Sequence, residues 1–264
     1  MMHDFWFLTA VGTAVAVGLF TLTWLLSLKL DNFSFVDVTW SYALAVVAPL
    51  YAWLAGGGWT QRKIIAVTMA VVWSVRLGTY LFFRVKRHHP HEDVRYAVLR
   101  EKWRDALALN FFFFFQAQAV LIVLLAVPVL LACLNPAPQL NAIEIAGALL
   151  WLTGICGEAL SDAQMQRFKA DPASKGKVCQ VGLWRYSRHP NYFFESVVWW
   201  GFWLFACGSP WGWVTLYAPL LMLHFLLRVT GIPLTEECAV KSKGDAYREY
   251  QRTTSAFVPW PPKS

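Results

Sequence analysis

One short segment concentrates side chains that can do chemistry. Residues 182–195 read Gly-Leu-Trp-Arg-Tyr-Ser-Arg-His-Pro-Asn-Tyr-Phe-Phe-Glu, and the apolar run 197–205 follows directly. Pro190 suits the first turn of a helix, where its missing N–H costs nothing. Arg188 and His189 then lie at the helix start, and Glu195 lies about one turn inside, where a carboxylate needs a partner or a ligand. A cationic membrane anchor would explain the basic and aromatic residues, but not Asn191 or Glu195.

A second polar group follows an apolar run in residues 157–169. Glu158, Asp162 and Gln166 are spaced four apart and share one helix face, and Lys169 continues near that face. Carboxylates followed by a cation can bind a ribose or an ammonium group at one end and phosphates at the other. The alternative is an ordinary solvated helix end, which explains Lys169 well and Glu158 poorly.

The loop between these two groups is basic. Lys175 and Lys177 come close in sequence to Arg185 and Arg188. Several cations beside a helix N-terminus form a natural phosphate site. Since no GxGxxG or Walker motif is present, a nucleotide would have to bind inside a helical bundle.

Polar residues also occur within two apolar runs of the N-terminal half. Arg76, Tyr80 and Arg84 are spaced four apart and share one helix face. Asp37 lies in the preceding apolar run and is placed to face them. We therefore hypothesise a catalytic role for Asp37, Tyr80 and Arg76. A purely structural Asp37–Arg76 ion pair between two helices is the alternative.

The elements that position these residues are membrane helices. The chain is 57% hydrophobic and 15% charged, whereas about a quarter of the residues in a soluble domain are charged. We expect an all-α, polytopic membrane protein with about seven transmembrane helices. The predicted spans are 5–28, 35–54, 64–83, 106–134, 143–160, 193–207 and 213–227.

Lys and Arg residues predict the orientation. Segments 84–104 and 167–188 and the tail from residue 228 are rich in them, while the turns 135–141 and 208–211 have none. Because cytoplasmic loops are enriched in Lys and Arg, we expect the N-terminus outside and the C-terminus in the cytoplasm. Arg62 and Lys63 fall on the opposite side. We predict one transmembrane domain over 1–264, with a C-terminal cofactor-binding half over 142–264.

Composition also indicates which classes of binding partner are favoured. The net charge of +7 comes from loops between apolar spans, which favours anionic lipid headgroups or an anionic cofactor over nucleic acid. Five scattered Cys without CxxC spacing indicate neither a metal site nor a disulfide framework. In the polar tail we expect Thr235 to cap a short helix that Gly244 ends, and a second helix from Ala246.

The segment 157–195 resembles the C-terminal domain of the steroid 5-alpha-reductase superfamily. The chain as a whole is similar to a bacterial branch of it with Asp-x-x-Trp in the second span, here 37–40, and Arg-Leu-x-x-Tyr-Leu-x-x-Arg in the third, here 76–84. The resemblance implies an NADPH-dependent reductase of an activated carbon–carbon double bond in a lipophilic substrate, embedded in a bacterial inner membrane with its cofactor site facing the cytoplasm. The implied cofactor residues are Glu158, Asp162, Lys169, Lys177, Arg185, Arg188, His189, Asn191, Tyr192, Glu195, Tyr247 and Tyr250.

The chain departs from steroid reductases at the substrate. Their Gln-Glu pair in the second span is absent, and Trp73 occupies the position of their third-span Tyr. Residues 188–192, with Glu236 and Tyr247 to Tyr250, also resemble isoprenylcysteine and phospholipid methyltransferases, which bind S-adenosylmethionine. NADPH carries three phosphates and S-adenosylmethionine none, so the many cations favour NADPH. A non-enzymatic scaffold or transporter is the third alternative, disfavoured because no inverted repeat is present.

Overall fold

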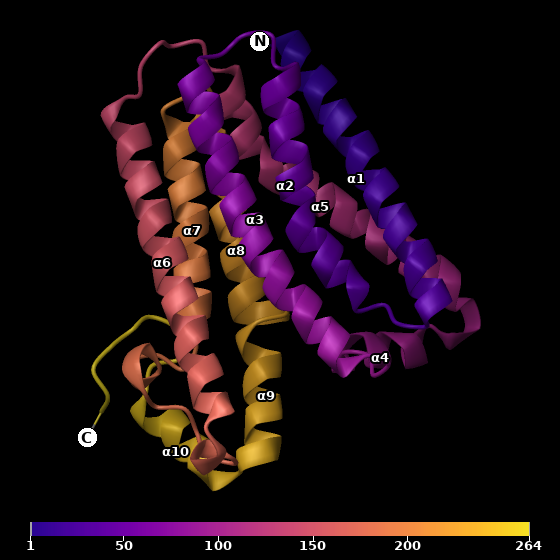
Figure 1. The fold of residues 1–264 in the computed structure, drawn as a ribbon, viewed down its shortest axis with the longest axis vertical. Helices are drawn as coiled ribbons and strands as arrows, with labels where there is room; N and C mark the ends of the chain where they lie inside the picture. Colours follow the sequence, from indigo (N-terminus) through magenta and orange to yellow (C-terminus); the bar gives the residue numbers. More distant parts are fainter. Residues whose placement is uncertain (1, 264) are drawn as a thin grey trace. The chain divides into compact units, whose positions relative to one another are not determined.

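The computed structural model describes residues 2–263, which fold into helices without a β-strand (Figure 1). The chain divides into two compact units. The first unit comprises Met1–Asn141 and Gly208–Gly212, and the second comprises Ala142–Cys207 and Trp213–Ser264. The second unit thus begins at Ala142, the residue at which the sequence analysis placed the start of the C-terminal half.

The first unit contains five α-helices. They are α1 (Met2–Leu30), α2 (Phe35–Leu54), α3 (Thr60–His88), α4 (Val94–Lys102) and α5 (Leu107–Leu134), with a 3₁₀ turn at Arg104–Ala106. Helix α2 packs on α3, and α1 packs on α5. Large apolar side chains fill the interior, among them Phe20, Leu44, Trp73, Phe111 and Phe115. The buried faces are mostly apolar, as the hydrophobic runs of the sequence predict, although Arg62 is also fully buried.

The second unit is organised around two long helices. They are α6 (Ala142–Ala170) and α7 (Pro190–Cys207), joined by a loop with 3₁₀ turns at Pro172–Ser174 and Gly182–Arg185. Three shorter helices follow, α8 (Tyr217–His224), α9 (Ile232–Lys243) and α10 (Asp245–Thr253). A π-helical turn at Phe225–Val229 connects α8 to α9.

Helices α6 and α7 lie side by side in close backbone contact (Figure 1). A Cβ atom built on Gly154 would lie 2.6 Å from the backbone nitrogen of Val198, and one on Gly201 would lie 2.5 Å from that of Trp151. Only glycine permits such an approach, and small residues serve this purpose at membrane helix interfaces. Gly147, Gly154 and Gly157 of α6 meet Phe205, Val198 and Phe194 of α7 in that order. The two helices are therefore antiparallel.

Six helical stretches are long and apolar enough to cross a membrane within the described residues. They are Met2–Leu30, Phe35–Leu54, Thr60–His88, Arg104–Leu134, Ala142–Ala170 and Gly212–Lys243. The protein is therefore an integral membrane protein. Helix α7, which the sequence analysis counted as a span, is not among the six. Its 18 residues include the polar Asn191 and Glu195 in the first two turns.

Some of the helix boundaries predicted from the sequence are confirmed, and one is wrong. Pro190 begins α7 and Gly244, with φ +55°, ends α9, as predicted. The prediction that Thr235 caps the tail helix is wrong, because α9 begins three residues earlier at Ile232. Pro233 fits the first turn of α9, and the Thr235 hydroxyl donates to the Gly231 carbonyl instead of capping.

Candidate functional site

The antiparallel register of α6 and α7 brings four predicted site residues to one level. The Cβ position of Gly157 meets the ring of Phe194, which fixes the depth at which the two helices pair near their polar ends. Glu158 and Asp162 on α6 therefore lie within a turn of the level of Asn191 and Glu195 on α7. Glu158 and Glu195 are buried. The sequence predicted a polar mouth at the start of one membrane helix, and the register adds residues of α6 at a similar level.

Asn191 carries a buried acceptor atom without a hydrogen bond from the described residues. Its Oδ1 atom is buried and has no hydrogen-bond partner within residues 2–263. Buried amide oxygens are normally satisfied, and an exception calls for an explanation. By contrast, Glu195 Oε1 accepts a hydrogen bond from Trp199 Nε1 at 2.8 Å. Asn191 is thus suited to accept a hydrogen bond from a ligand N–H group.

Arg188 and His189 bind the C-terminal segment of the chain. Arg188 Nε donates to Glu236 Oε1 at 2.6 Å, and His189 Nε2 lies 3.2 Å from the same oxygen. Gln251 Nε2 donates to the other carboxylate oxygen at 2.9 Å. We call Arg188, His189, Glu236 and Gln251 the C-terminal latch. The charge of Arg188 is thus compensated by Glu236 inside the protein, and its role as a phosphate-binding cation stays a prediction.

Tyr192 and the two tail tyrosines belong to the same packing. The Tyr192 ring stacks on His189 with centroids 5.4 Å apart, and its hydroxyl lies 3.1 Å from Thr235 Oγ1. Tyr250 donates to the backbone carbonyls of Trp184 and Ser187. Burial raises the pKa of Tyr250, and burial with the charge of Glu236 raises that of Tyr247 to about 12. These tyrosines fix the tail to the rest of the second unit, and their contact with a cofactor stays a prediction.

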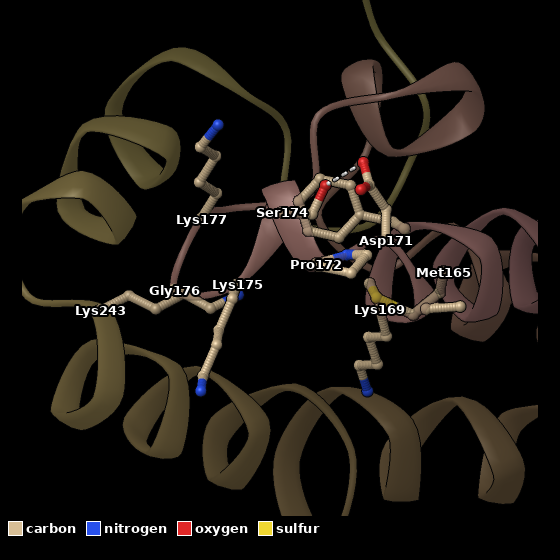
Figure 2. A pocket seen from close by; sticks show the side chains of 11 residues that line it. Met165, Lys169, Asp171, Pro172, Ser174, Lys175, Gly176, Lys177 and Lys243 are labelled. Atoms are coloured by element: carbon tan, nitrogen blue, oxygen red, sulfur yellow. Dashed lines mark hydrogen bonds between the residues drawn. The ribbon is translucent and has the colours of Figure 1, made fainter.

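Four lysines line a single cavity at the end of α6 (Figure 2). Lys169 comes from the last turn of α6, Lys175 and Lys177 from the following loop, and Lys243 from the last residue of α9. The cavity has a volume of about 530 Å³. We call it the lysine cavity. It contains two predicted cofactor residues, Lys169 and Lys177, and Lys175 from the predicted basic loop.

The charges of the lysine cavity are not balanced. Within the part of the chain that the structure describes, none of the four amines forms an ion pair with a carboxylate. Asp171 also lines the cavity, but its carboxylate accepts hydrogen bonds from the Ala173 amide and the Ser174 hydroxyl (Figure 2). Four cations around one space repel each other, and an anion of several charges relieves that repulsion. The cavity is therefore suited to a polyphosphate.

Arg185 lies in a different place. It lines a second cavity together with Gln180, Glu249, Thr253 and Lys263. The 3₁₀ turn that carries Arg185 is fixed on α6, because Gln164 Oε1 accepts the Leu183 amide at 2.8 Å. The sequence placed Arg185 with the loop lysines, and the structure separates them.

The predicted catalytic residues lie in the first unit. Asp37 Oδ2 accepts from Arg95 Nη2 and Asp37 Oδ1 accepts from the Tyr96 hydroxyl, each at 2.6 Å. Arg84 approaches the same carboxylate at 3.6 Å. The alternative of an Asp37–Arg76 ion pair is thus replaced by a network with α4. Arg76 and Tyr80 lie on α3, and the Tyr80 side chain is exposed.

The network around Asp37 is electrostatically complete. Asp93 accepts from Arg95 at 2.9 Å and from Arg84 at 3.2 Å. Burial opposes ionisation of Asp93, but the hydrogen bond and charge of Arg95, with the charge of Arg84, lower the pKa of Asp93 below its ordinary value. We call Asp37, Arg84, Asp93, Arg95 and Tyr96 the α4 network.

Two elements of this arrangement escaped the sequence analysis. Lys243 was not singled out, because it lies far along the chain from the loop lysines and in a polar tail. Lys243 lies seven residues, about two helical turns, after Glu236. That spacing could have indicated that both residues share one side of the tail helix. Arg95 and Tyr96 were counted only as part of a basic segment, and the Asp93-x-Arg95 spacing resembles that of many solvated helix starts.

Helix arrangement and site together define a polytopic α-helical membrane protein with a cationic cavity at the end of a membrane helix. Comparison with known proteins gives its family: residues 23–254 match the family described as Protein of unknown function (DUF1295), and the chain belongs to that family. The match extends from α1 into α10 and so includes the lysine cavity. The uncharacterized protein C594.04c of Schizosaccharomyces pombe is 29% identical over 288 residues, which cover 97% of this chain and 82% of the relative. No solved structure matches the chain significantly.

Proposed function

We propose that this protein is a membrane-embedded reductase that uses NADPH to reduce an activated carbon–carbon double bond in a lipophilic substrate. The observation that carries the proposal is the lysine cavity, with four amines and no ion pair to a carboxylate in the described residues. A ligand rich in phosphate fits that charge. The resemblance of residues 157–195 to the steroid 5-alpha-reductase superfamily selects NADPH among such ligands.

The residues present fit the parts of NADPH. Lys169, Lys175, Lys177 and Lys243 offer cations for three phosphates. The buried Oδ1 of Asn191 is an acceptor for the N–H of a carboxamide. From Asp162 to Lys169, α6 rises about 10 Å at 1.5 Å per residue. That separation is shorter than an extended dinucleotide, so one molecule can reach both the polar mouth and the lysine cavity.

When bound, NADPH supplies the hydride, and the protein supplies binding, orientation and electrostatics. Glu158, Asp162 and Asn191 would orient the dinucleotide, while the lysines hold its phosphates. Arg76 and Tyr80 remain candidates for polarising or protonating the substrate. Asp37 is withdrawn from that role, because its carboxylate is held by Arg95 and Tyr96. A steroid-, isoprenoid- or enoyl-lipid-like substrate suits a site reached from the bilayer.

We further propose that α7 is a seventh membrane span. It pairs along its length with α6, which is itself apolar enough to span, and its 18 residues extend about 27 Å. Seven spans and the charged segments support an N-terminus outside and a C-terminus in the cytoplasm. The lysine cavity would then face the cytoplasm, where NADPH is available, in a bacterial inner membrane.

A methyltransferase that uses S-adenosylmethionine is the second candidate. One observation favours it: Arg188, His189 and Glu236, which the resemblance to lipid methyltransferases assigns to that cofactor, gather at one point. However, both oxygens of the Glu236 carboxylate already accept hydrogen bonds within the protein. S-adenosylmethionine also has no phosphate, so it would leave the charge of the lysine cavity uncompensated.

A thermal unfolding experiment separates the two candidates. The detergent-purified protein is heated with NADPH, NADH or S-adenosylmethionine at matched concentrations. A ligand that binds only the folded state stabilises it by about 2.7 kcal/mol at a hundred times its Kd. We expect the largest rise in midpoint with NADPH, and a smaller rise in the Asn191→Ala variant. A rise with S-adenosylmethionine alone would identify the methyltransferase, and no rise with any ligand would refute both.

A further inference from the structure

Helix α9 connects the C-terminal latch to the lysine cavity. Glu236 and Lys243 are seven residues apart on α9, so they lie on the same side of the helix two turns apart. Glu236 is held by Arg188 and His189 at the start of α7. Lys243, at the other end of α9, lines the lysine cavity. The position of the Lys243 amine therefore depends on how α9 is fixed at Glu236.

Lys243 differs from the other three lysines of the cavity. Lys169, Lys175 and Lys177 follow one another along α6 and its loop, whereas Lys243 arrives from a separate element. It is also only partly exposed, while those three are exposed. Lys169 and Lys243 thus line the same cavity from two different helices. Two neighbouring cations match a phosphate monoester, which carries up to two negative charges at neutral pH.

NADPH presents phosphate at two separate places, a pyrophosphate and a monoester on one ribose, and NADH lacks the monoester. The four lysines of the cavity come from three elements, and the side chains of Lys175 and Lys177 point in opposite directions from their loop (Figure 2). The four amines can therefore reach phosphates at separate places, and Lys243 is the lysine carried by α9. Building on the proposed function, we infer that Lys243 determines specificity by binding the ribose monoester phosphate, and that Glu236 is its positioning residue.

The residues of the C-terminal latch are largely buried and form several hydrogen bonds, as the positioning of Lys243 requires. The Arg188 and His189 side chains are 9% and 3% exposed, and Glu236 is 15% exposed. Arg188 Nη1 also donates to the Gln251 carbonyl at 3.0 Å, and the Arg188 amide donates to the Ser255 carbonyl at 2.8 Å. A latch that ties α9 and the chain after α10 to α7 leaves little freedom for the end of α9.

The test is the ratio of NADPH to NADH affinity, measured by equilibrium titration of the full-length protein in detergent. Lys243→Ala is expected to weaken NADPH binding about tenfold or more, as the loss of one charge-assisted contact implies, and to leave NADH binding within about twofold. Lys243→Arg keeps the preference for NADPH. Lys241→Ala is the matched control: it removes a lysine from the same helix, but one that pairs with Glu237 at an exposed position.

Glu236→Gln tests the positioning role. It should lower the same ratio while NADH binding persists, because a merely structural defect would weaken both cofactors equally. Equal weakening of NADPH and NADH in Lys243→Ala would overturn the specificity role while leaving the NADPH proposal intact. Failure of the wild-type protein to bind either dinucleotide would overturn both proposals.

Discussion

The α4 network of the first unit and the lysine cavity of the second unit are both clusters of charge near the ends of membrane helices, but they are built in opposite ways. In the α4 network, each of two guanidinium groups lies within 3.6 Å of both carboxylates, and a buried tyrosine completes the set. In the lysine cavity, four amines line one space and none forms an ion pair within the described residues.

The difference separates charged groups that compensate one another within the fold from charged groups that are left uncompensated. Paired groups at partly buried positions compensate each other, and removing one leaves the other exposed to a desolvation penalty. Unpaired like charges repel, so they contribute nothing to the stability of the folded chain. The C-terminal latch belongs with the first kind, since Glu236 neutralises Arg188. The sequence pattern of scattered Lys and Arg does not distinguish these two kinds.

The largest loss of stability is expected from a substitution in the α4 network. Arg95→Ala would leave Arg84 as the remaining guanidinium partner of Asp37 and Asp93, and we expect a loss of about 3 kcal/mol in unfolding free energy. Thermal or denaturant unfolding in detergent measures this loss. Arg87→Ala, at an exposed position of the last turn of α3, is the control and should change stability by less than about 0.5 kcal/mol. Equal effects of the two variants would contradict a structural role for the network.

The second unit should depend on helix contact rather than on its lysines. In Gly201→Ala the new methyl group meets the Trp151 backbone at 2.5 Å, and forcing the helices apart should cost about 2 kcal/mol. Gly18→Ala on α1 is the control, because no atom lies within 4 Å of the new Cβ there. Unfolding midpoints of the two variants give the comparison; a tolerated Gly201→Ala would show that α6 and α7 are not in tight contact.

The α4 network also predicts a smaller dependence on pH. Because Asp93 has a lowered pKa in the folded protein, its stabilising contribution is present above its ordinary value of 3.8 and is lost as the pH falls through the lower folded value. Unfolding midpoints measured from pH 6 down to pH 3 (from about two units above the ordinary carboxyl pKa values to about one unit below them) should fall at the acidic end of the range. In Asp93→Asn this fall should be shallower; an unchanged profile would mean that Asp93 gains nothing from Arg95.

The smallest effect on stability belongs to the lysine cavity. Lys175→Ala combined with Lys177→Ala removes two exposed, unpaired amines, and we expect a change within about 0.5 kcal/mol. At low ionic strength the change should be stabilising, because repulsion among the amines is relieved and is less screened. Unfolding at two salt concentrations measures this. A large destabilisation would place these lysines among the groups that hold the fold.

Much of this architecture was predictable from local pattern. The apolar runs gave the membrane helices, Pro190 and Gly244 gave two helix boundaries, and four-residue spacing placed Glu158 and Asp162 on one face. What could not be predicted depends on contacts between segments far apart in the sequence. The partner of Arg188 is Glu236, 48 residues away. The partners of Asp37 are 58 and 59 residues away on α4. No local spacing indicates which of several cations a carboxylate will bind.

The central claim is that the lysine cavity holds the phosphates of NADPH. It is tested most directly by titrating NADPH into the wild-type protein and the Lys175→Ala, Lys177→Ala variant at several salt concentrations. The account predicts saturable binding to the wild-type protein that weakens with salt, and binding at least about tenfold weaker in the variant while its unfolding midpoint is unchanged. Equal NADPH affinity in the two proteins, or no saturable binding to the wild type, would contradict it.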